Sequence, residues 1–263
     1  MLPFISRRER FDVVGSTNDV VRSWLAAGTP EVCLAVADTQ SAGRGREGRT
    51  WTAPAGAALL LSLGFRPVWL RPDQLWRLAA IVSLAMAEAG EEIARLPSGT
   101  IALKWPNDLV VEGVDSLNKL AGVLGETDGL GTDDPRAVIG IGVNGDWSRD
   151  AFPPDIADSM TSLAELASGP VDHDALLDAF LGRVESYVED LRRGRFDGPG
   201  WSDRQVTTDR DVDLVAADGS RTTVTATGVD ADTGALLAGG RSVFVGEIAH
   251  VRVTTPAAAP GVV

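Results

Sequence analysis

Residues 43–51 read Gly-Arg-Gly-Arg-Glu-Gly-Arg-Thr-Trp and separate two apolar runs, Val32–Ala37 and Ala58–Phe65. Three glycines and three arginines fall within seven of these residues. Glycine destabilises the interior of a helix or strand because it loses so much backbone freedom on folding. The stretch therefore predicts a loop, called the Gly/Arg loop below, whose N–H groups and guanidinium forks suit an anion. On these residues alone, an anion-binding loop and an ordinary solvated surface loop are equally good interpretations.

Two glycine patterns, at residues 43–48 and 140–145, match the spacing of the dinucleotide-binding fingerprint. That fingerprint also needs a helix directly after it and an acidic residue about 20 positions on. The residues after Gly48 and after Gly145 include Trp and Pro and do not begin a helix. We therefore reject a nicotinamide-dinucleotide site. A Walker A phosphate loop is also excluded, because neither lysine follows a glycine.

Composition restricts the class of protein. The net charge of −13 and the pI near 4.6 argue against general nucleic-acid binding, which needs a basic surface. No apolar run reaches the roughly 20 residues of a membrane span, and the N-terminus has no signal-peptide pattern. A single cysteine, Cys33, excludes an internal disulfide, and two distant histidines argue against a metal site. We expect a cytoplasmic protein with no bound metal of its own and no membrane partner.

Lysine is rare in this chain and its two positions are informative. Of 24 basic residues, only Lys104 and Lys119 are lysines. A compact ammonium suits a tight pocket beside a phosphate or carboxylate better than a planar guanidinium does. Chance can also place two lysines anywhere, so the observation supports a site only together with the motifs around them.

The hydrophobic pattern predicts an α+β fold with a mixed sheet. We expect strands over 11–15, 32–37, 57–65, 101–104, 109–112, 119–127 and 136–143, and helices over 16–28, 72–89, 159–167 and 172–193. Ser16-Thr17-Asn18 at the start of the first helix is either a simple cap or a set of polar ligand contacts.

The pattern changes near residues 196–202, which are rich in Gly and contain Pro199. Short alternating strands follow, over 212–215, 222–229, 235–237, 243–245 and 248–253. We expect one domain over 1–203, a small β-barrel-like domain over 204–255 and a disordered tail over 256–263.

Four motifs in this order resemble those of the biotin protein ligases: Ser16–Asn18, Ala42–Arg49, Lys104–Asp108 with Lys119–Leu124, and Gly140–Asn144. The resemblance spans about residues 11–253. It implies a catalytic domain of the biotin/lipoate ligase type with an SH3-like C-terminal domain. Because the motifs begin at Ser16, we expect the monofunctional type, without a DNA-binding domain.

The resemblance implies that biotin reacts with Mg²⁺-ATP to give biotinyl-5′-AMP and pyrophosphate. The biotinyl group then passes to a lysine of the biotin carboxyl carrier domain of an acyl-CoA carboxylase. Such a reaction needs positioned cations to bring two anions together, without a covalent enzyme intermediate. The expected cofactors are ATP, Mg²⁺ and biotin as a substrate, and the expected oligomeric state is a monomer or weak dimer.

The resemblance also assigns site residues, by their matching motifs. The catalytic residues are Lys119, Arg46 and Asp108. Biotin contacts are Ser16, Thr17, Asn18, Gln40, Arg44, Gly45, Arg46 and Lys119. ATP or adenylate contacts are Arg46, Arg49, Trp51, Lys104, Asn107 and Asn144, and no residue is assigned to a metal.

Two alternatives stay open: a lipoate or octanoate ligase of the same fold, and a non-catalytic biotin-binding regulator. This chain also departs from the family pattern at two places. Glu47 stands where relatives often carry a basic residue, and the segment between Asp108 and Lys119 is longer and carries Asp115. A longer hairpin here could displace Lys119 from the site.

Overall fold

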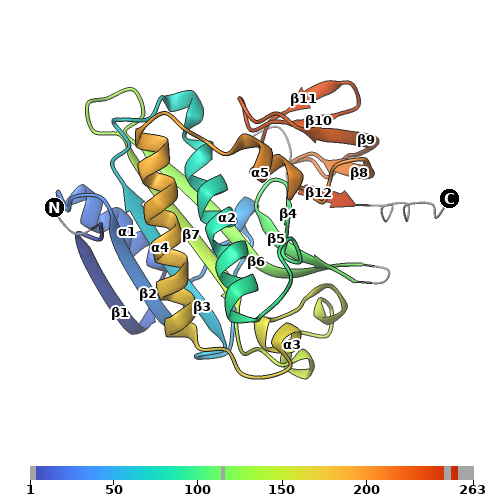
Figure 1. The fold of residues 1–263 in the computed structure, drawn as a ribbon, viewed down its shortest axis with the longest axis horizontal. Coiled ribbons are helices and arrows are strands. Elements are labelled where there is room, and N and C mark those ends of the chain that lie inside the picture. Colours follow the sequence, from blue (N-terminus) through green and yellow to red (C-terminus); the bar gives the residue numbers. More distant parts are fainter. Residues whose placement is uncertain (1–3, 114–115, 246–249, 254–263) are drawn as a thin grey trace.

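The centre of the molecule is a seven-stranded mixed sheet (Figure 1). The computed structural model describes residues 4–113, 116–245 and 250–253. Neighbouring strands follow the order β1-β2-β3-β7-β6-β5-β4; β1 and β2 are parallel and the other neighbours are antiparallel. The strands are β1 (Arg7–Val14), β2 (Cys33–Gln40), β3 (Ala58–Phe65), β4 (Ala102–Lys104), β5 (Asp108–Glu112), β6 (Leu117–Asp128) and β7 (Arg136–Asn144). This arrangement confirms the predicted α+β class.

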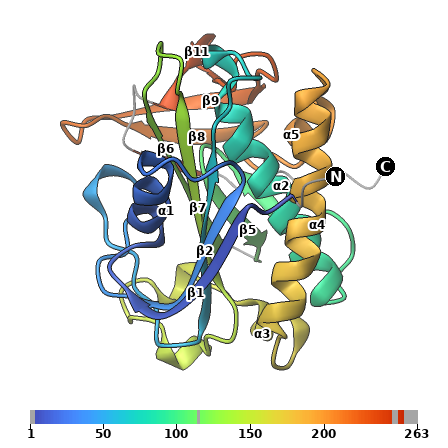
Figure 2. The same cartoon turned by 90° about the vertical axis from the view of Figure 1, so that its left-hand side faces the viewer.

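Helices cover both faces of this sheet (Figure 2). The helix α1 (Thr17–Ala26) lies on one face, and α2 (Trp76–Ile93) and α4 (His173–Arg192) lie on the other. Because β3 is covered from both sides, all of its residues are buried and its sequence is a continuous apolar run apart from Ser62. Two further α-helices are short, α3 (Leu163–Ala167) and α5 (Gly198–Asp203).

Two expected helix starts were wrong. The helix expected over 159–167 is only α3, because Ser162 caps it by accepting the Glu165 N–H while Thr161 N–H donates to the Lys119 carbonyl and keeps the preceding residues extended. The helix expected from Pro72 is a 3₁₀ turn, Pro72–Gln74, followed by α2. The Gly-rich segment 196–202, where we expected the domain boundary, contains α5, whose first turn is capped by the Asp197 carboxylate.

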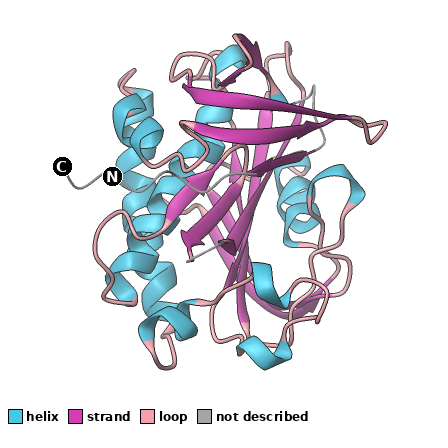
Figure 3. Cartoon of the chain, turned by 90° about the vertical axis from the view of Figure 1, so that its right-hand side faces the viewer, coloured by secondary structure: helices cyan, strands magenta, loops and turns pink. Residues whose placement is uncertain are grey.

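A second, antiparallel sheet forms the C-terminal module, with strand order β11-β10-β9-β8-β12. Its strands are β8 (Arg210–Val215), β9 (Arg221–Val229), β10 (Leu236–Ala238), β11 (Arg241–Val243) and β12 (His250–Val253), and they run across those of the large sheet (Figure 3). This agrees with a small barrel-like domain, although the strand expected over 243–245 lies at 241–243. The boundary at 203/204 remains a prediction. Asp115 and the expected tail over 256–263 lie outside the described residues.

Backbone and core contacts join the two sheets. Leu103 N–H donates to the Arg204 carbonyl at 2.8 Å, and Val206 N–H donates to the Leu103 carbonyl at 2.8 Å. Buried residues of the C-terminal module, such as Leu236 and Val251, belong to the same hydrophobic core as the large sheet. The strand that leads into the Lys104–Asp108 motif is therefore attached directly to the C-terminal module.

Among the residues that the structure describes, none of the helices has the length and apolarity needed to cross a bilayer.

A buried ion pair strengthens this junction. Glu91 on α2 is 5% exposed and accepts hydrogen bonds from both terminal nitrogens of Arg204, at 2.9 and 3.0 Å. The same carboxylate accepts the Gly99 and Ile101 N–H groups, each at 2.9 Å. One side chain thus satisfies four donors around the entry to β4.

Replacing Glu91 should strongly destabilise the protein. We expect Glu91→Ala to lower the free energy of unfolding by about 3–5 kcal/mol, because it leaves a buried guanidinium and two N–H groups without their acceptor. Urea unfolding measures the change. The matched control is Glu92→Ala, which removes an ion pair with Arg183 from a carboxylate that is 58% exposed and should cost under about 1 kcal/mol. Equal losses in the two variants would contradict the role of Glu91.

Candidate functional site

The smaller of two adjoining cavities, the inner cavity, has a volume of about 140 Å³. It lies between the start of α1, the Gly/Arg loop and residues of β3, β6 and β7. Every residue that the sequence analysis assigned to biotin lines it: Ser16, Thr17, Asn18, Gln40, Arg44, Gly45, Arg46 and Lys119. Residues that are over 100 positions apart in sequence therefore meet as the resemblance predicts, whereas their individual roles remain predictions.

Buried polar groups at the start of α1 are held in one hydrogen-bond chain. Thr17 donates from its N–H and its hydroxyl to Gln40 Oε1, at 2.7 and 3.1 Å. The hydroxyl of Ser62, which is fully buried in β3, lies 2.7 Å from Thr17 Oγ1 and 2.5 Å from Asn18 Oδ1. The Ser16 side chain makes no capping bond to α1. The Gln40 carbonyl is thus occupied within the protein, and its NH₂ group and the Ser16 hydroxyl are the groups that a polar ligand can use.

Arg44 is held by carboxylates at the edge of the inner cavity. Its guanidinium donates to both oxygens of Asp19, at 2.7 and 2.8 Å, and approaches Glu126 at 3.3 Å. The hydrogen bond from Arg44 is the main cause that holds the pKa of Asp19 below its usual range. Glu126 also accepts from Asn18 Nδ2 at 2.6 Å. Arg44 therefore shapes the wall as part of an ion-pair network, and Glu126 is a contributor that the sequence analysis missed.

Glycines on β6 and β7 leave space for the side chains of Asn18 and Trp51. A Cβ at Gly140 would lie 2.2 Å from Asn18 Oδ1, and a Cβ at Gly142 would lie 2.7 Å from the Trp51 ring. Strand pairing puts Gly142 beside Gly122, where a Cβ would also approach Trp51, at 3.1 Å. Glycine at alternate positions of a strand marks close approach of another group. The pattern at residues 140–145 has this packing role, in agreement with our rejection of a dinucleotide fingerprint.

A β-bulge directs Lys119 toward the site. Leu109 pairs with Ala121 but Val110 pairs with Lys119, so Leu120 is an extra residue in β6. Side chains alternate between the faces of a strand, and one extra residue reverses this alternation. Lys119 is thereby brought to the face of Gly122 and Asp108. The longer segment before Lys119 has not displaced it from the site.

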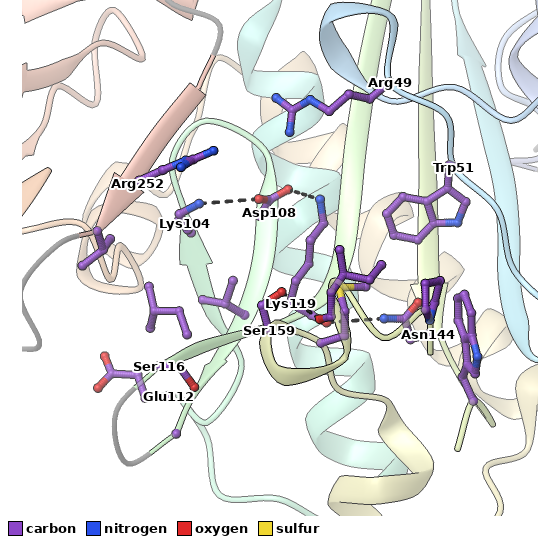
Figure 4. Close-up of a pocket in the computed structure, with 18 of the residues that line it drawn as sticks. Arg49, Trp51, Lys104, Asp108, Glu112, Ser116, Lys119, Asn144, Ser159 and Arg252 are labelled. Atoms are coloured by element: carbon purple, nitrogen blue, oxygen red, sulfur yellow. Dashed lines mark hydrogen bonds and ion pairs between the residues drawn. The ribbon is translucent and has the colours of Figure 1, made fainter. Parts of the chain in front are cut away.

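Asp108 lies between the two lysines of the chain (Figure 4). Its Oδ1 is 2.6 Å from Lys119 Nζ, and its Oδ2 is 3.8 Å from Lys104 Nζ. Lys119 Nζ also lies 5.4 Å from the centre of the Trp51 ring. Burial lowers the pKa of the Lys104 ammonium, and the charge of Asp108 opposes this effect. Burial likewise lowers the pKa of Arg46, whose Nη2 donates to the Val245 carbonyl of the C-terminal module at 3.1 Å.

The larger, outer cavity has a volume of about 710 Å³ and lies between the large sheet and the C-terminal module (Figure 4). Its lining includes six residues that the sequence analysis assigned to ATP, the adenylate or catalysis: Arg49, Trp51, Lys104, Asp108, Lys119 and Asn144. Arg210 and Arg252 line it from the C-terminal module. Sequence reasoning missed both, since an arginine in an alternating strand is ordinary by itself.

The two asparagines assigned to the nucleotide have structural contacts. Asn107 lines the inner cavity and not the outer one, and its Nδ2 donates to the Val123 carbonyl at 3.0 Å. Asn144 is fully buried, and its Nδ2 donates to the Thr161 carbonyl at 2.9 Å and the Lys119 carbonyl at 3.3 Å. Asn144 thus braces the strand that carries Lys119 and also contributes to the outer cavity.

Comparison with known proteins gives one consistent result. The model of the biotin/lipoate A/B protein ligase family matches residues 11–144. The chain is 31% identical to the biotin–[acetyl-CoA-carboxylase] ligase of Mycobacterium tuberculosis over 92% of this chain and 90% of that protein. It is 32% identical to the bifunctional ligase/repressor of Bacillus subtilis over 68% of this chain, which spans 53% of that protein.

The fold agrees with the sequence. The biotin protein ligase of Aquifex aeolicus in complex with biotin and ATP superposes with a TM-score of 0.77 and 25% identity, covering 94% of this chain and 99% of that one. The chain belongs to the biotin/lipoate A/B protein ligase family, among its biotin protein ligases.

Proposed function

We propose that this chain is an ATP-dependent biotin ligase. It forms biotinyl-5′-AMP from biotin and ATP and transfers the biotinyl group to a lysine of the biotin carboxyl carrier domain of an acyl-CoA carboxylase. The observation that carries the proposal is the shared wall of the inner and outer cavities. Both are lined by Arg49, Trp51, Asp108 and Lys119. A ligand carboxylate in the inner cavity thus meets a phosphate in the outer one beside the Lys119 ammonium.

The polar end of the inner cavity suits the ureido ring of biotin. The Gln40 NH₂ group and the Ser16 hydroxyl serve the ring carbonyl and ring N–H groups, and Thr17 and Ser62 hold Gln40 and Asn18 in position. A site built on such bonds rejects analogues that lack them. A saturated alkyl acid such as octanoate would leave these groups unpaired.

The chemistry of adenylation follows from the cations. The biotin carboxylate attacks the α-phosphorus of ATP, the P–O bond to pyrophosphate breaks, and pyrophosphate leaves with its electron pair. Lys119 stabilises the charge at the reacting oxygens, and Arg46 closes over the same centre. Arg252, Arg49 and Lys104 face the remaining phosphates. The hydrogen bond of Lys119 to Asp108 fixes the ammonium position before the ligands arrive.

Magnesium is proposed to arrive with ATP. The carboxylates that line the outer cavity already pair with cations: Asp108 lies 2.6 Å from Lys119, and Glu112 lies 2.5 Å from Arg210. In the described part of the chain, no group of three or more His, Cys, Asp or Glu residues could hold a metal ion. An ion held mainly by phosphate oxygens would need few protein ligands here, and it would neutralise charge on the leaving pyrophosphate. The cytoplasmic location and the monomer or weak dimer also remain proposals.

Formation of the acyl-adenylate tests the proposed function. Purified protein, Mg²⁺ and α-labelled ATP are incubated with biotin, lipoate or octanoate, and the acyl-AMP is resolved. We expect an adenylate with biotin only. An adenylate from lipoate or octanoate would assign the chain to the sister activity, and biotin binding without any adenylate would indicate a regulatory binding protein.

Removing the Lys119 ammonium should abolish most of this activity. We expect Lys119→Met to lower the rate of adenylate formation by about 10²–10³-fold, as expected for the loss of a charge aimed at the reacting oxygens. In urea unfolding, this variant should lose less stability than Glu91→Ala, because Lys119 is 28% exposed and Lys104 still lies 3.8 Å from Asp108. Arg193→Met, which removes an exposed cation from the end of α4, serves as the control. Near-normal turnover by Lys119→Met would disprove its catalytic role.

Gln40 should affect the affinity for biotin and leave the affinity for ATP nearly unchanged. We expect Gln40→Leu to raise the Kd of biotin by about 10- to 100-fold, because a buried polar group without its partner costs roughly 1–3 kcal/mol. The KM for ATP should stay within about twofold. Calorimetry with biotin and initial rates with ATP measure the two effects. Gln74→Leu, at the end of the 3₁₀ turn Pro72–Gln74, is the control for the same chemical change elsewhere.

Lys104 should make ATP binding sensitive to alkaline pH. Its pKa is lowered by burial, so it loses its positive charge at a lower pH than an ordinary lysine. We expect the KM for ATP to rise as the pH enters this range. In Lys104→Arg this rise should be absent, because arginine stays protonated. Superimposable pH profiles for the two proteins would show that Lys104 does not bind the phosphates as a cation.

A further inference from the structure

A third cavity, the side cavity, has a volume of about 420 Å³ and approaches Asp108 from the side of α2. Its walls come from the Gly/Arg loop, α2, the loop over 105–107, the middle of β6 and the C-terminal module. They include Arg46, Glu47, Trp76, Ala79, Ala80, Ser83, Lys104, Trp105, Asp108, Trp201, Gln205 and Val245. Neither biotin nor ATP needs this space in the proposed reaction.

Asp108 lines all three cavities. The proposed reaction has three reactants: biotin, ATP and an acceptor lysine. Two of the cavities account for the first two. The acceptor Nζ must reach the carbonyl carbon of the mixed anhydride, which would form beside Lys119 and Asp108. We propose that the side cavity admits the acceptor lysine side chain and that Glu47 attracts its ammonium at the entrance. This inference rests on the proposed ligase function.

The walls of the side cavity suit an alkylammonium chain. Trp76, Trp105 and Trp201 line it, and the rings of Trp76 and Trp201 lie 4.9 Å apart. The apolar ring surface that reaches the cavity can pack against the methylene groups that carry an ammonium. Ala79 and Ala80 on α2 also line the cavity, and their small side chains take little of its space.

Carboxylates stand at both ends of this path. Glu47 is exposed on the Gly/Arg loop, and Asp108 is at the inner end. The backbone at Glu47 is left-handed, with φ 54° and ψ 40°. An L-residue adopts this conformation at a cost that glycine or asparagine avoids. An acid at this position is therefore not explained by the turn alone, and electrostatic guidance of a cation gives it a role.

Two cations also line the side cavity, and both are held. Arg46 donates to the Val245 carbonyl at 3.1 Å, and Lys104 lies 3.8 Å from Asp108 Oδ2. Each is also a wall of one of the other cavities, where the anionic adenylate would bind. The adenylate would neutralise these cations before the acceptor arrives. The acceptor lysine would therefore meet less positive charge than biotin and ATP do.

The acceptor amine must lose its proton before it can attack. The acceptor ammonium gives one proton to Asp108, directly or through water, and its lone pair attacks the carbonyl carbon of biotinyl-AMP. The C–N bond forms, the C–O bond to AMP breaks, and AMP leaves with that electron pair. The second amine proton passes to solvent as the amide forms. No oxidant, reductant or further co-reactant is required.

Two variants of the side cavity test the proposal. Ala79→Leu narrows the passage and Glu47→Gln removes the charge at its entrance. In single turnovers of enzyme-bound biotinyl-AMP, we expect Ala79→Leu to slow transfer to a biotin carboxyl carrier domain by about tenfold or more. Glu47→Gln should raise the KM for that domain about two- to fivefold at low ionic strength, with the difference shrinking in high salt.

The same variants should leave reactions that do not use the passage unchanged. We expect wild-type rates of biotinyl-AMP formation and of its reaction with hydroxylamine, a nucleophile small enough to need no such path. Ala179→Leu, a half-buried alanine on α4, and Glu9→Gln, an exposed acid on β1, are the matched controls.

Each outcome has a defined meaning. Wild-type transfer in both side-cavity variants would overturn the inference. Equal losses with hydroxylamine, or slower biotinyl-AMP formation, would also overturn it, because the residues would then serve the active centre and not the path of the acceptor. If the wild-type protein forms no biotinyl-AMP at all, the proposed ligase function itself fails.

Discussion

The contact between Lys119 and Asp108 is the interaction on which the arrangement of the site depends. Two opposite charges lie 2.6 Å apart on one face of the sheet, at the point where three cavities meet. The contact exists because the extra residue Leu120 reverses the alternation of side chains along β6. Without the bulge, the lysine would point to the face that α2 and α4 cover. A local irregularity of one residue thus decides where the ammonium is available for chemistry.

Glycines of β6 and β7 are as important for the site as its polar side chains. Gly140 leaves room for Asn18, and Gly142 and Gly122 leave room for the ring of Trp51. Glycine weakens a strand through its backbone entropy, but each of these positions lies inside the sheet and pairs with a strand on both sides. The flat surface that results lets a tryptophan of the Gly/Arg loop lie directly against the sheet beside Lys119.

The C-terminal module is part of the site and not only an appendage. It contributes Arg252 to the outer cavity, and its Val245 carbonyl accepts a hydrogen bond from Arg46 of the Gly/Arg loop. Leu103 pairs with the backbone on both sides of Gln205, so the strand leading to Lys104 is attached to this module. Motion of the module relative to the sheet would therefore change the loop and the phosphate-facing cavity together.

Much of this arrangement could be predicted from the amino-acid sequence. Apolar periodicity predicted the mixed sheet and the two long helices, because burial against a sheet imposes a repeat that is visible in the residues themselves. Four motifs in order predicted the family, and the residues they assigned to biotin line one cavity. The short helix after residue 159 was misjudged, because the pairing of Thr161 with Lys119 is a long-range contact that no local pattern reveals.

The sequence by itself determined the fold class, the family and the residue types of the site, since these depend on local composition and order. Only the tertiary structure decided which way the side chains point. Three features depend on strand register and on packing between distant segments. They are the bulge at Leu120, the packing of Trp51 against Gly122 and Gly142, and the position of Arg252 at the outer cavity. Register depends on the whole sheet, and the sequence of one strand does not show which residues of its neighbour it pairs with.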